Sequence, residues 1–317
     1  QAWPNHDLHE VVGTRTKYIY AMTFVLLAAS VIAVGYFYLM NFERQYRAET
    51  EQTLISIASM KVRALVDWKT DYLKDGEVLF KNISFQALVR RYLENPKDAD
   101  AQRQLQILMG AYPDNFHFDK VRLIDRQGVT RMSIPDERTP TSLVIKGYIP
   151  EVLRSPQVTF VDFYFCDDCQ KIHMAVLVPI LSDQGGNRPL AILDMRIDPT
   201  VIFFPLVQLW PVPSQSGEAL IIRREGNDAL FLNELKFQQG TALKLRFSLA
   251  DNKNLPAMKA ALGQEGIVEG DDYRGVPVLA CVYAVPNSPW FLVAKMDISE
   301  VYAPVRNRMW MTLGLVV

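Results

Sequence analysis

The chain has 317 residues, of which 49% are hydrophobic and 22% are charged, a composition that excludes a disordered or collagen-like protein. Its 34 Lys and Arg residues are balanced by 35 Asp and Glu residues, and the resulting net charge of −1 provides no field that would attract a nucleic acid. The mean hydropathy of +0.02 is slightly high for a soluble protein and indicates that one strongly apolar segment is averaged with ordinary globular sequence.

That apolar segment is residues 18–40, which contain no charged side chain. As a helix they would extend about 35 Å, enough to cross a hydrocarbon core of about 30 Å. Tyrosines stand near both ends, where a membrane interface favours them. We therefore predict an uncleaved transmembrane helix over 18–40, with a buried core helix or a cleaved signal peptide as the alternatives. Residues 1–17 would form a cytoplasmic N-terminal arm.

After this helix, residues 41–73 carry apolar side chains at helical spacing and contain no Pro or Gly. They predict a stalk helix, about 48 Å long, that continues from the membrane. A second helical stretch is expected over 84–112, with an interruption at residues 95–96, where an Asn precedes a Pro. The Tyr112–Asn115 segment that follows is typical of a turn.

The pattern then changes to strands. Alternating apolar residues and intervening turns predict strands at 120–125, 129–134, 158–165, 172–180 and 190–197. Hairpin connections make these strands an antiparallel sheet, and the preceding helices would cover it, which is an α+β arrangement. Two prolines within the Trp210–Ser214 segment then break the chain, because proline suits neither a helix nor the interior of a sheet. We expect a domain boundary there.

The second half of the chain repeats this order of elements in a smaller form. The expected elements are strands at 218–224, 229–233, 243–249, 276–285 and 290–296, and a helix at 255–262. A helix from about Ser299 leads into an uncharged apolar run at 309–317. Because so short a run cannot cross a bilayer, we interpret 304–317 as the start of a second transmembrane helix that is truncated in this sequence.

The order of the predicted elements resembles that of the double Cache (dCache) sensor domains of bacterial receptors. In both, a helix leaves the membrane, two α+β modules follow, and the chain returns to the membrane. The likeness is most specific over 205–304, in the stretches LIIRREGNDALFLNEL, LPAMKAALGQEGIVEGDDYRGVPVLA and VPNSPWFLVAKMD. They are similar to the membrane-proximal module of PAS-containing sensor histidine kinases and GGDEF-type signalling proteins. The resemblance implies two tandem PAS-like modules, a membrane-distal one at 74–209 that holds the ligand pocket and a membrane-proximal one at 210–303.

The resemblance also implies a cellular setting. It implies a homodimeric, multi-pass protein of the bacterial inner membrane, with residues 41–307 in the periplasm. A cytoplasmic histidine kinase or diguanylate cyclase would lie outside this chain. A ligand would act by a population shift, because a ligand that prefers one packing of the distal module against the long helix would displace that helix relative to the second span. The expected partners are a small molecule (an amino acid, carboxylate or amine) and the lipid bilayer, and no nucleic acid.

The strongest candidates for ligand contact lie on the last strand of the distal module. Alternation along 190–197 places Asp194 and Arg196 on the face opposite to the apolar residues of that strand. Such a pair could hold a zwitterionic or polar ligand, or its two members could bind each other. In amino-acid-binding Cache domains an Asp at the corresponding position grips the ligand amine, and Asp194 resembles it. The Tyr-x-Arg-x-Trp-Tyr run of those domains is absent before Tyr148.

Four further residues are weaker candidates for the ligand site. Alternation from Val158 places Asp162 and Tyr164 on one face of their strand, and Arg131 and Tyr148 come from the neighbouring strand and loop. A solvated strand face is the alternative interpretation for each of these residues.

Cys166 and Cys169 stand at the tip of the hairpin between two predicted strands. The ends of a β-turn lie within about 7 Å, and a disulfide needs a Cα separation of about 4.4 to 6.8 Å, so the pair could close across the turn. We predict a disulfide and no metal, because Cys-x2-Cys-x3-His, ending at His173, lacks a second ligand pair. A redox-active pair and a metal site of the two cysteines, His173 and an Asp are the alternatives. Cys281 is expected to be buried in a strand.

Signatures of catalysis are absent from the sequence, which contains no Gly-x-Ser-x-Gly, no His-Glu-x-x-His and no phosphate-binding glycine loop. We therefore predict no enzymatic activity and no cofactor for this chain, and interpret it as the sensor region of a receptor. Two alternatives come from other functional classes. One is an anchored ectodomain that binds a periplasmic partner protein, and the other is an anchored extracytoplasmic enzyme.

Overall fold

The computed structural model describes residues 7–136, 140–167, 169–182, 189–306 and 308. They fall into two compact units, one formed by Leu54–Met296 and the other by the residues before Leu54 together with those from Asp297 onward. The larger unit contains both sheets and every side chain predicted for the ligand site.

The smaller unit is built on the first part of a long helix, α1 (Asp7–Phe80). Within the described residues it is the one helix long and apolar enough to cross a membrane, by length and composition. The short helix α7 (Ile298–Val301) precedes Tyr302, whose hydroxyl accepts a hydrogen bond from Arg47 at 3.3 Å. Most of the predicted start of a second membrane helix, 304–317, and the first six residues of the N-terminal arm lie outside the described residues.

The first sheet of the larger unit has five antiparallel strands in the order β2-β1-β5-β4-β3. The strands are β1 (Lys120–Asp125), β2 (Thr130–Ile134), β3 (Thr159–Cys166), β4 (Lys171–Leu181) and β5 (Pro189–Ile197). Each begins and ends within one residue of the range that apolar alternation predicts. The central strands β1, β5 and β4 are almost completely buried because helices cover both faces.

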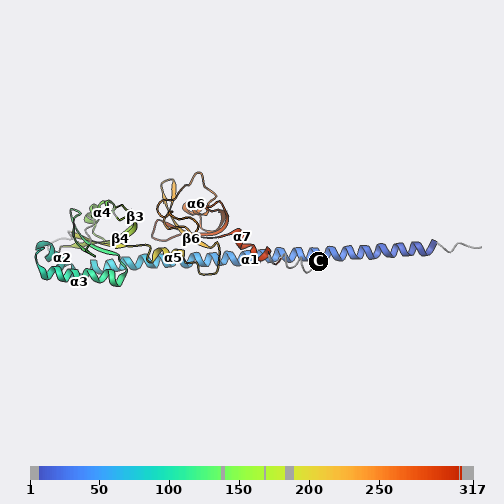
Figure 1. Ribbon diagram of the computed structural model, residues 1–317, viewed down its shortest axis with the longest axis horizontal. Coiled ribbons are helices and arrows are strands. Elements are labelled where there is room, and N and C mark those ends of the chain that lie inside the picture. Colours follow the sequence, from blue (N-terminus) through green and yellow to red (C-terminus); the bar gives the residue numbers. More distant parts are fainter. Residues whose placement is uncertain (1–6, 137–139, 168, 183–188, 307, 309–317) are drawn as a thin grey trace, which may run out of the picture. The chain divides into compact units, whose positions relative to one another are not determined.

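Figure 1 shows α2 (Ile83–Glu94) and α3 (Ala99–Phe116) on one side of this sheet and α4 (Leu143–Arg154) on the other. Two predictions were wrong here. The segment Tyr112–Asn115 is not a turn, because α3 continues through Pro113 to Phe116. The helix α4 was not predicted, since it contains both Gly147 and Pro150.

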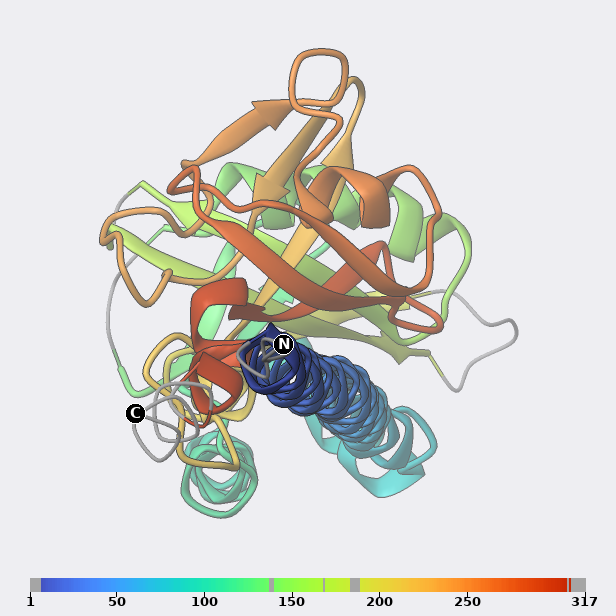
Figure 2. The same cartoon turned by 90° about the vertical axis from the view of Figure 1, so that its right-hand side faces the viewer.

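The second sheet has six strands in the order β8-β7-β6-β11-β10-β9, and the pairs β8–β7, β7–β6, β6–β11 and β10–β9 are antiparallel. The strands are β6 (Glu218–Glu225), β7 (Asp228–Phe231), β8 (Arg246–Ser248), β9 (Gly266–Asp271), β10 (Pro277–Ala284) and β11 (Trp290–Asp297). Helix α6 (Pro256–Ala261) lies against one face of this sheet (Figure 2). The strand β9 was not predicted, because two glycines and two acidic residues interrupt its apolar pattern.

The second part of α1 packs directly on the first sheet. The helix was expected to end near residue 73 but continues to Phe80 through Gly76. A Cβ atom at Gly76 would lie 2.8 Å from Val158, 2.9 Å from Val176 and 3.3 Å from Val178. Glycine is therefore required at this position by the close approach of helix and sheet.

Farther toward its N-terminus, α1 binds the short helix α5 (Phe203–Gln208), which the sequence pattern did not predict. The buried ammonium group of Lys61 donates hydrogen bonds to the carbonyl oxygens of Leu206, Val207 and Leu209 at 3.0, 2.8 and 2.7 Å. Burial lowers the pKa of Lys61 to about 8. The ammonium thus donates to carbonyls at the C-terminal end of α5. Such terminal carbonyls have no hydrogen-bond donor within their own helix.

We expect Lys61→Met to lower the free energy of unfolding by about 1 to 3 kcal/mol, because buried carbonyls would lose their donor while the side-chain volume is kept. Urea unfolding followed by circular dichroism would measure the loss. Lys74→Met is the matched control on the same helix, since Lys74 is exposed and forms only a surface ion pair with Asp71. Equal losses in the two variants would contradict the role given to Lys61.

Candidate ligand-binding site

The face of the first sheet that α4 covers combines an apolar cluster with charged side chains. The helix begins at Ser142, whose hydroxyl accepts a hydrogen bond from the Ile145 amide at 3.3 Å. The apolar cluster comprises Ile124, Ile145, Ile149, Val152, Val161, Tyr164, Cys166, Ala175, Leu177 and Ile192. Strand alternation continues this face to Arg122, two residues from Ile124 in β1, and to Asp194, two residues from Ile192 in β5.

Arg122 and Asp194 form a buried ion pair across the two central strands. They are register partners, and their side chains are only 3% and 0% exposed. The Arg122 Nε and Nη2 atoms donate to Asp194 Oδ2 at 2.9 and 2.6 Å, whereas Asp194 Oδ1 is buried and has no hydrogen-bond partner. A buried carboxylate oxygen without a donor is costly, so Oδ1 is the place where a ligand donor would be stabilised most.

The low-polarity surroundings of this pair act on the neighbouring titratable groups. Burial raises the pKa of Tyr164, and the negative charge of Asp194 raises it further, so the phenol keeps its proton. For Arg122, burial opposes the charged form, but the Asp194 carboxylate more than compensates and raises the pKa of the guanidinium. The site therefore presents a charged pair beside a neutral phenol.

A second ion pair continues this face of the sheet. The Arg196 Nε atom donates to both carboxylate oxygens of Asp119, at 3.1 and 2.8 Å, and the Arg196 Nη2 atom lies 2.6 Å from Asp119 Oδ2. The His173 Nδ1 atom lies 3.8 Å from the same oxygen and has no hydrogen-bond partner. Burial, and next the Arg196 charge, lowers the pKa of His173 to about 4, so its imidazole is neutral near pH 7.

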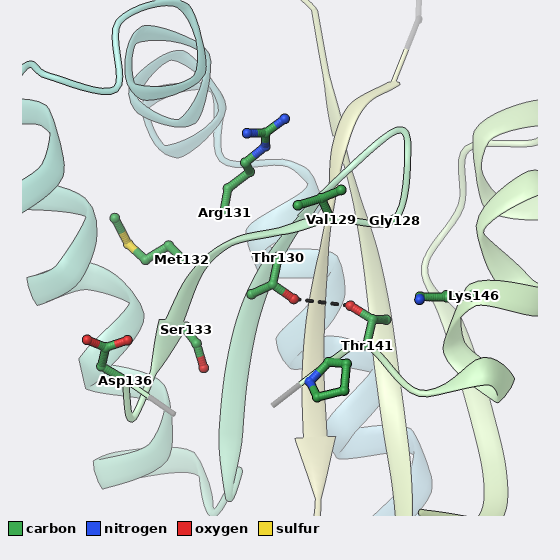
Figure 3. Close-up of a pocket in the computed structure, with 10 residues that line it drawn as sticks. Gly128, Val129, Thr130, Arg131, Met132, Ser133, Asp136, Thr141 and Lys146 are labelled. Carbon is green, nitrogen blue, oxygen red and sulfur yellow. Dashed lines mark hydrogen bonds between the residues drawn. The ribbon is translucent and has the colours of Figure 1, made fainter. Parts of the chain in front are cut away.

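A cavity of about 570 Å³ lies along β2, within the size range of small-molecule sites (Figure 3). Thr130 of β2 and Thr141, just before α4, line it side by side, with a hydrogen bond of 3.1 Å between their hydroxyl oxygens, and Lys146 of α4 also lines it. The Arg122 Nη1 atom donates to the Pro140 carbonyl at 3.3 Å, and Pro140 is itself part of the lining. The cavity thus reaches the buried ion pair only through Pro140, since neither Arg122 nor Asp194 is among its lining residues.

The structure brings three of the predicted residues together, namely Asp194, Arg196 and Tyr164. It corrects the expectation that Asp194 and Arg196 could bind each other, because each pairs instead with a residue on or beside β1. Tyr148 lies on α4 rather than in a loop and packs against the apolar cluster that includes Tyr164.

Asp162 lies outside this group of residues, and the prediction that it shares a strand face with Tyr164 was wrong. A β-bulge between Val161 and Tyr164 inserts one extra residue into β3, so the two side chains no longer share a face. The Asp162 carboxylate accepts hydrogen bonds from Arg223 Nη1 at 2.7 Å and from Trp290 Nε1 at 2.8 Å, both on the second sheet. Asp162 thus joins the two modules of the larger unit.

Arg131 lies at the edge of the first sheet, on β2. It lines the 570 Å³ cavity and also a second cavity, of about 510 Å³, that Tyr92 of α2 helps to line. Its guanidinium is 51% exposed and pairs with Asp125 at 2.6 Å. Arg131 is therefore near the candidate site but is separate from the buried ion pairs.

Arg122 and Asp119 were not predicted from the sequence, and His173 was considered only as a ligand of an alternative metal site. A signal for Arg122 was present, because alternation in β1 places it opposite the core residues Val121 and Leu123. Its pairing with Asp194 was not visible, because β1 and β5 are adjacent only through the order of strands in the sheet.

The second sheet carries an ion pair of opposite polarity at the corresponding place. Glu218 and Lys295 are register partners across β6 and β11, just as Arg122 and Asp194 are across β1 and β5. Lys295 Nζ contacts Glu218 Oε2 at 2.8 Å and Asp272 Oδ2 at 2.7 Å, while Tyr273 donates to both Glu218 oxygens. The space beside Lys295 and α6 amounts to about 10 Å³, at most room for one water, while Glu218 also lines a separate cavity of about 290 Å³. Both Glu218 oxygens accept hydrogen bonds, whereas Asp194 Oδ1 is an acceptor without a donor.

At the tip of the β3–β4 hairpin, Cys166 and Cys169 are joined by a disulfide with a Cα separation of 5.5 Å. Cys169 Sγ lies 3.2 Å from His173 Nε2. Both cysteines also contribute to the apolar cluster beneath α4. Cys281 is buried in β10, as expected.

No protein-family model and no curated protein matches this sequence. Solved structures with a similar fold are ligand-binding domains of bacterial chemoreceptors. That of PctB from Pseudomonas aeruginosa PAO1, an amino acid chemoreceptor in complex with L-Arg, has a TM-score of 0.53 and 15% identity, over 81% of this chain and 98% of that one. That of CtaA from Pseudomonas fluorescens in complex with L-leucine has a TM-score of 0.54 and 13% identity, over 82% and 100%.

A third structure is the domain of the Pseudomonas aeruginosa PAO1 amino acid chemoreceptor PctC in complex with GABA. Its TM-score is 0.52 at 16% identity, over 78% of this chain and 100% of that one. Identities this low show a shared fold. They confirm the fold predicted from the sequence, a long N-terminal helix followed by two α+β modules with antiparallel sheets.

Proposed function

We propose that this chain is the extracytoplasmic sensor region of a membrane receptor, and that its first module binds a small molecule carrying an ammonium group. The observation that carries the proposal is the Asp194 carboxylate, which is completely buried and keeps one oxygen without a hydrogen-bond donor. An ammonium group of a ligand would supply that donor and a second positive charge.

The neighbouring groups support a zwitterionic ligand. Thr130, Thr141 and Lys146 line the adjoining cavity with hydroxyl and ammonium donors that suit a carboxylate. The chemoreceptor domains with this fold are described in complex with L-Arg, L-leucine and GABA, each of which carries both an ammonium and a carboxylate group. Amino acids and related amines are therefore the class of ligand that we propose for this chain.

The second module has a structural role in this proposal. In its corresponding ion pair both Glu218 oxygens already have donors, and the space between Lys295 and α6 is too small for a ligand. The apolar helix anchors the sensor, the folded unit lies in the periplasm, and α1 carries a ligand-dependent displacement toward a cytoplasmic output such as a kinase or a diguanylate cyclase.

A thermal-shift screen of the full chain in detergent tests this function. Amino acids, their decarboxylated amines and the matching carboxylates would be added singly at about 1 mM. We expect an amino acid at about 100 times its Kd to raise Tm by about 5 °C, because binding to the folded state stabilises it by mass action. The matching carboxylate, which lacks the ammonium group, should give no shift.

Asp194→Asn should abolish the ligand-induced shift, since it keeps the side-chain volume but removes the charge. Lys295→Met is the matched control: it breaks the corresponding ion pair of the second module and should lower Tm while leaving the ligand-induced shift intact. An Asp194→Asn protein that retained every shift would exclude this site. If no compound in the screen shifted the native chain, a partner protein would replace the small molecule as the candidate ligand.

A further inference from the structure

The tip of the β3–β4 hairpin gathers three side chains that bind soft metals. Cys166 ends β3, Cys169 lies in the turn and His173 is the third residue of β4. One ligand atom from each of them falls within 4.8 Å of the others. His173 is the register partner of Tyr164, two residues before Cys166, so His173 and Cys166 lie on the same side of the hairpin.

The spacing suits a tetrahedral cation once the sulfurs are thiolates. With Zn–S bonds of about 2.3 Å and Zn–N bonds of about 2.0 Å, a sulfur and a nitrogen in one site lie about 3.5 Å apart, and two sulfurs about 3.8 Å apart. Cys169 Sγ and His173 Nε2 are already 3.2 Å apart. The two sulfurs must separate, which requires the disulfide to open.

The orientation of His173 is an independent indication of a ligand. Its ring is 1% exposed, with Nε2 turned to the cysteine sulfur. Its other nitrogen, Nδ1, is buried, has no hydrogen-bond partner and lies 3.8 Å from Asp119 Oδ2. Metal-binding histidines commonly face a carboxylate with the nitrogen that does not bind the metal. Asp119 is held in turn by Arg196, so this support is fixed within the protein.

We propose that the reduced hairpin binds one Zn²⁺-like cation through Cys166, Cys169 and His173. A dithiol first reduces the disulfide by thiol–disulfide exchange: the dithiol becomes a disulfide, and the two cysteines take up its two electrons and two protons. The cation then displaces both thiol protons, which leave to solvent, and binds the two thiolates and the imidazole. Three protein ligands leave a fourth position for water. The disulfide and the bound metal cannot be present together. Occupancy of this site therefore depends on both the redox state of the cysteines and the presence of the metal.

Co²⁺ titration of the full chain in detergent tests the site. The protein is reduced without oxygen by a phosphine, which takes an oxygen atom from water and does not compete for metal as a dithiol would. We expect one Co²⁺ per chain, with the intense visible bands of tetrahedral coordination and a thiolate-to-metal charge-transfer band. Zn²⁺ should bleach both. The same protein with its disulfide intact should give neither band, and this comparison needs no substitution.

Variants assign the ligands. Cys166→Ser and Cys169→Ser should lose the charge-transfer intensity in part or whole, and His173→Gln should weaken Co²⁺ binding at least about tenfold. Asp119→Asn should weaken it by about 10- to 100-fold without changing the spectrum, as expected of a residue that positions the ligand. Cys281→Ser, which alters the buried cysteine of β10, should bind like the native chain. Reduced native protein without tetrahedral bands, or His173→Gln with native affinity, would overturn the proposal.

Discussion

Replacing Arg122 by Met is expected to lower the free energy of unfolding by about 3 to 5 kcal/mol, because it leaves the Asp194 carboxylate buried without a counter-charge. Asp194→Leu should cost a similar amount for the converse reason, since the Arg122 guanidinium is only 3% exposed. The double variant should recover most of this loss, because an apolar pair of similar size can replace a buried ion pair with little net change.

Urea unfolding of the native chain, both single variants and the double variant gives a complete thermodynamic cycle. We expect a coupling energy of at least about 2 kcal/mol. The double variant is also informative about function, because it should be nearly as stable as the native chain and yet show no ligand-induced shift in Tm. Additive losses would show that the two side chains do not act as a pair.

Replacing Lys295 by Met should produce the other large loss, about 3 to 5 kcal/mol at pH 7, in the second module. Lys295 is 1% exposed and binds both Glu218 and Asp272. Its removal leaves the Glu218 carboxylate buried without a cation, whereas Asp272 keeps Arg274 as a partner.

The loss caused by Lys295→Met should depend on pH. Burial alone would raise the pKa of Asp272, but the hydrogen bond and charge of Lys295 and the hydrogen bonds from Arg274 outweigh it and hold the pKa below its ordinary value. A carboxylate with a depressed pKa stabilises the fold at pH values above its unfolded pKa, near 4, and this contribution is lost as pH falls through the folded pKa.

Urea unfolding at pH 7, 4 and 3 would measure this dependence. The difference in free energy of unfolding between the native chain and Lys295→Met should therefore be large at pH 7 and become smaller as pH falls below about 4. Arg246→Gln is a suitable control, because its ion pair with Glu225 is partly exposed and should contribute less than about 1 kcal/mol. A difference that stayed constant from pH 7 to pH 3 would show that Lys295 acts through packing alone.

The strands of the first sheet were predictable because each is a short run rich in apolar residues between turn sequences, and that pattern is local. The helix α4 was not, since Gly147 and Pro150 lower its helical propensity. The contacts of Ile145, Ile149 and Val152 with the sheet outweigh this cost. A capping serine followed by apolar residues at helical spacing was the available signal.

The candidate site was only partly predictable, for reasons that lie in tertiary structure. Alternation identified Asp194, but its partner Arg122 is 72 residues away and is brought close by the order of strands. The position of Asp162 depends on a bulge, which is a property of two paired strands rather than of one. The pairing of His173 with Asp119 likewise depends on tertiary structure, because His173 lies on β4 and Asp119 lies just before β1.

The close approach at Gly76 restricts how the long helix can move. Three valines of the first sheet and its preceding segment lie where a side chain at this position would be. If α1 turned about its own axis here, the side chain of Asp75 or Glu77 would enter that space and bring a charge against Val176 and Val178. Rotation of the helix within the module is therefore opposed by both steric and electrostatic cost, while motions that carry helix and sheet together remain available.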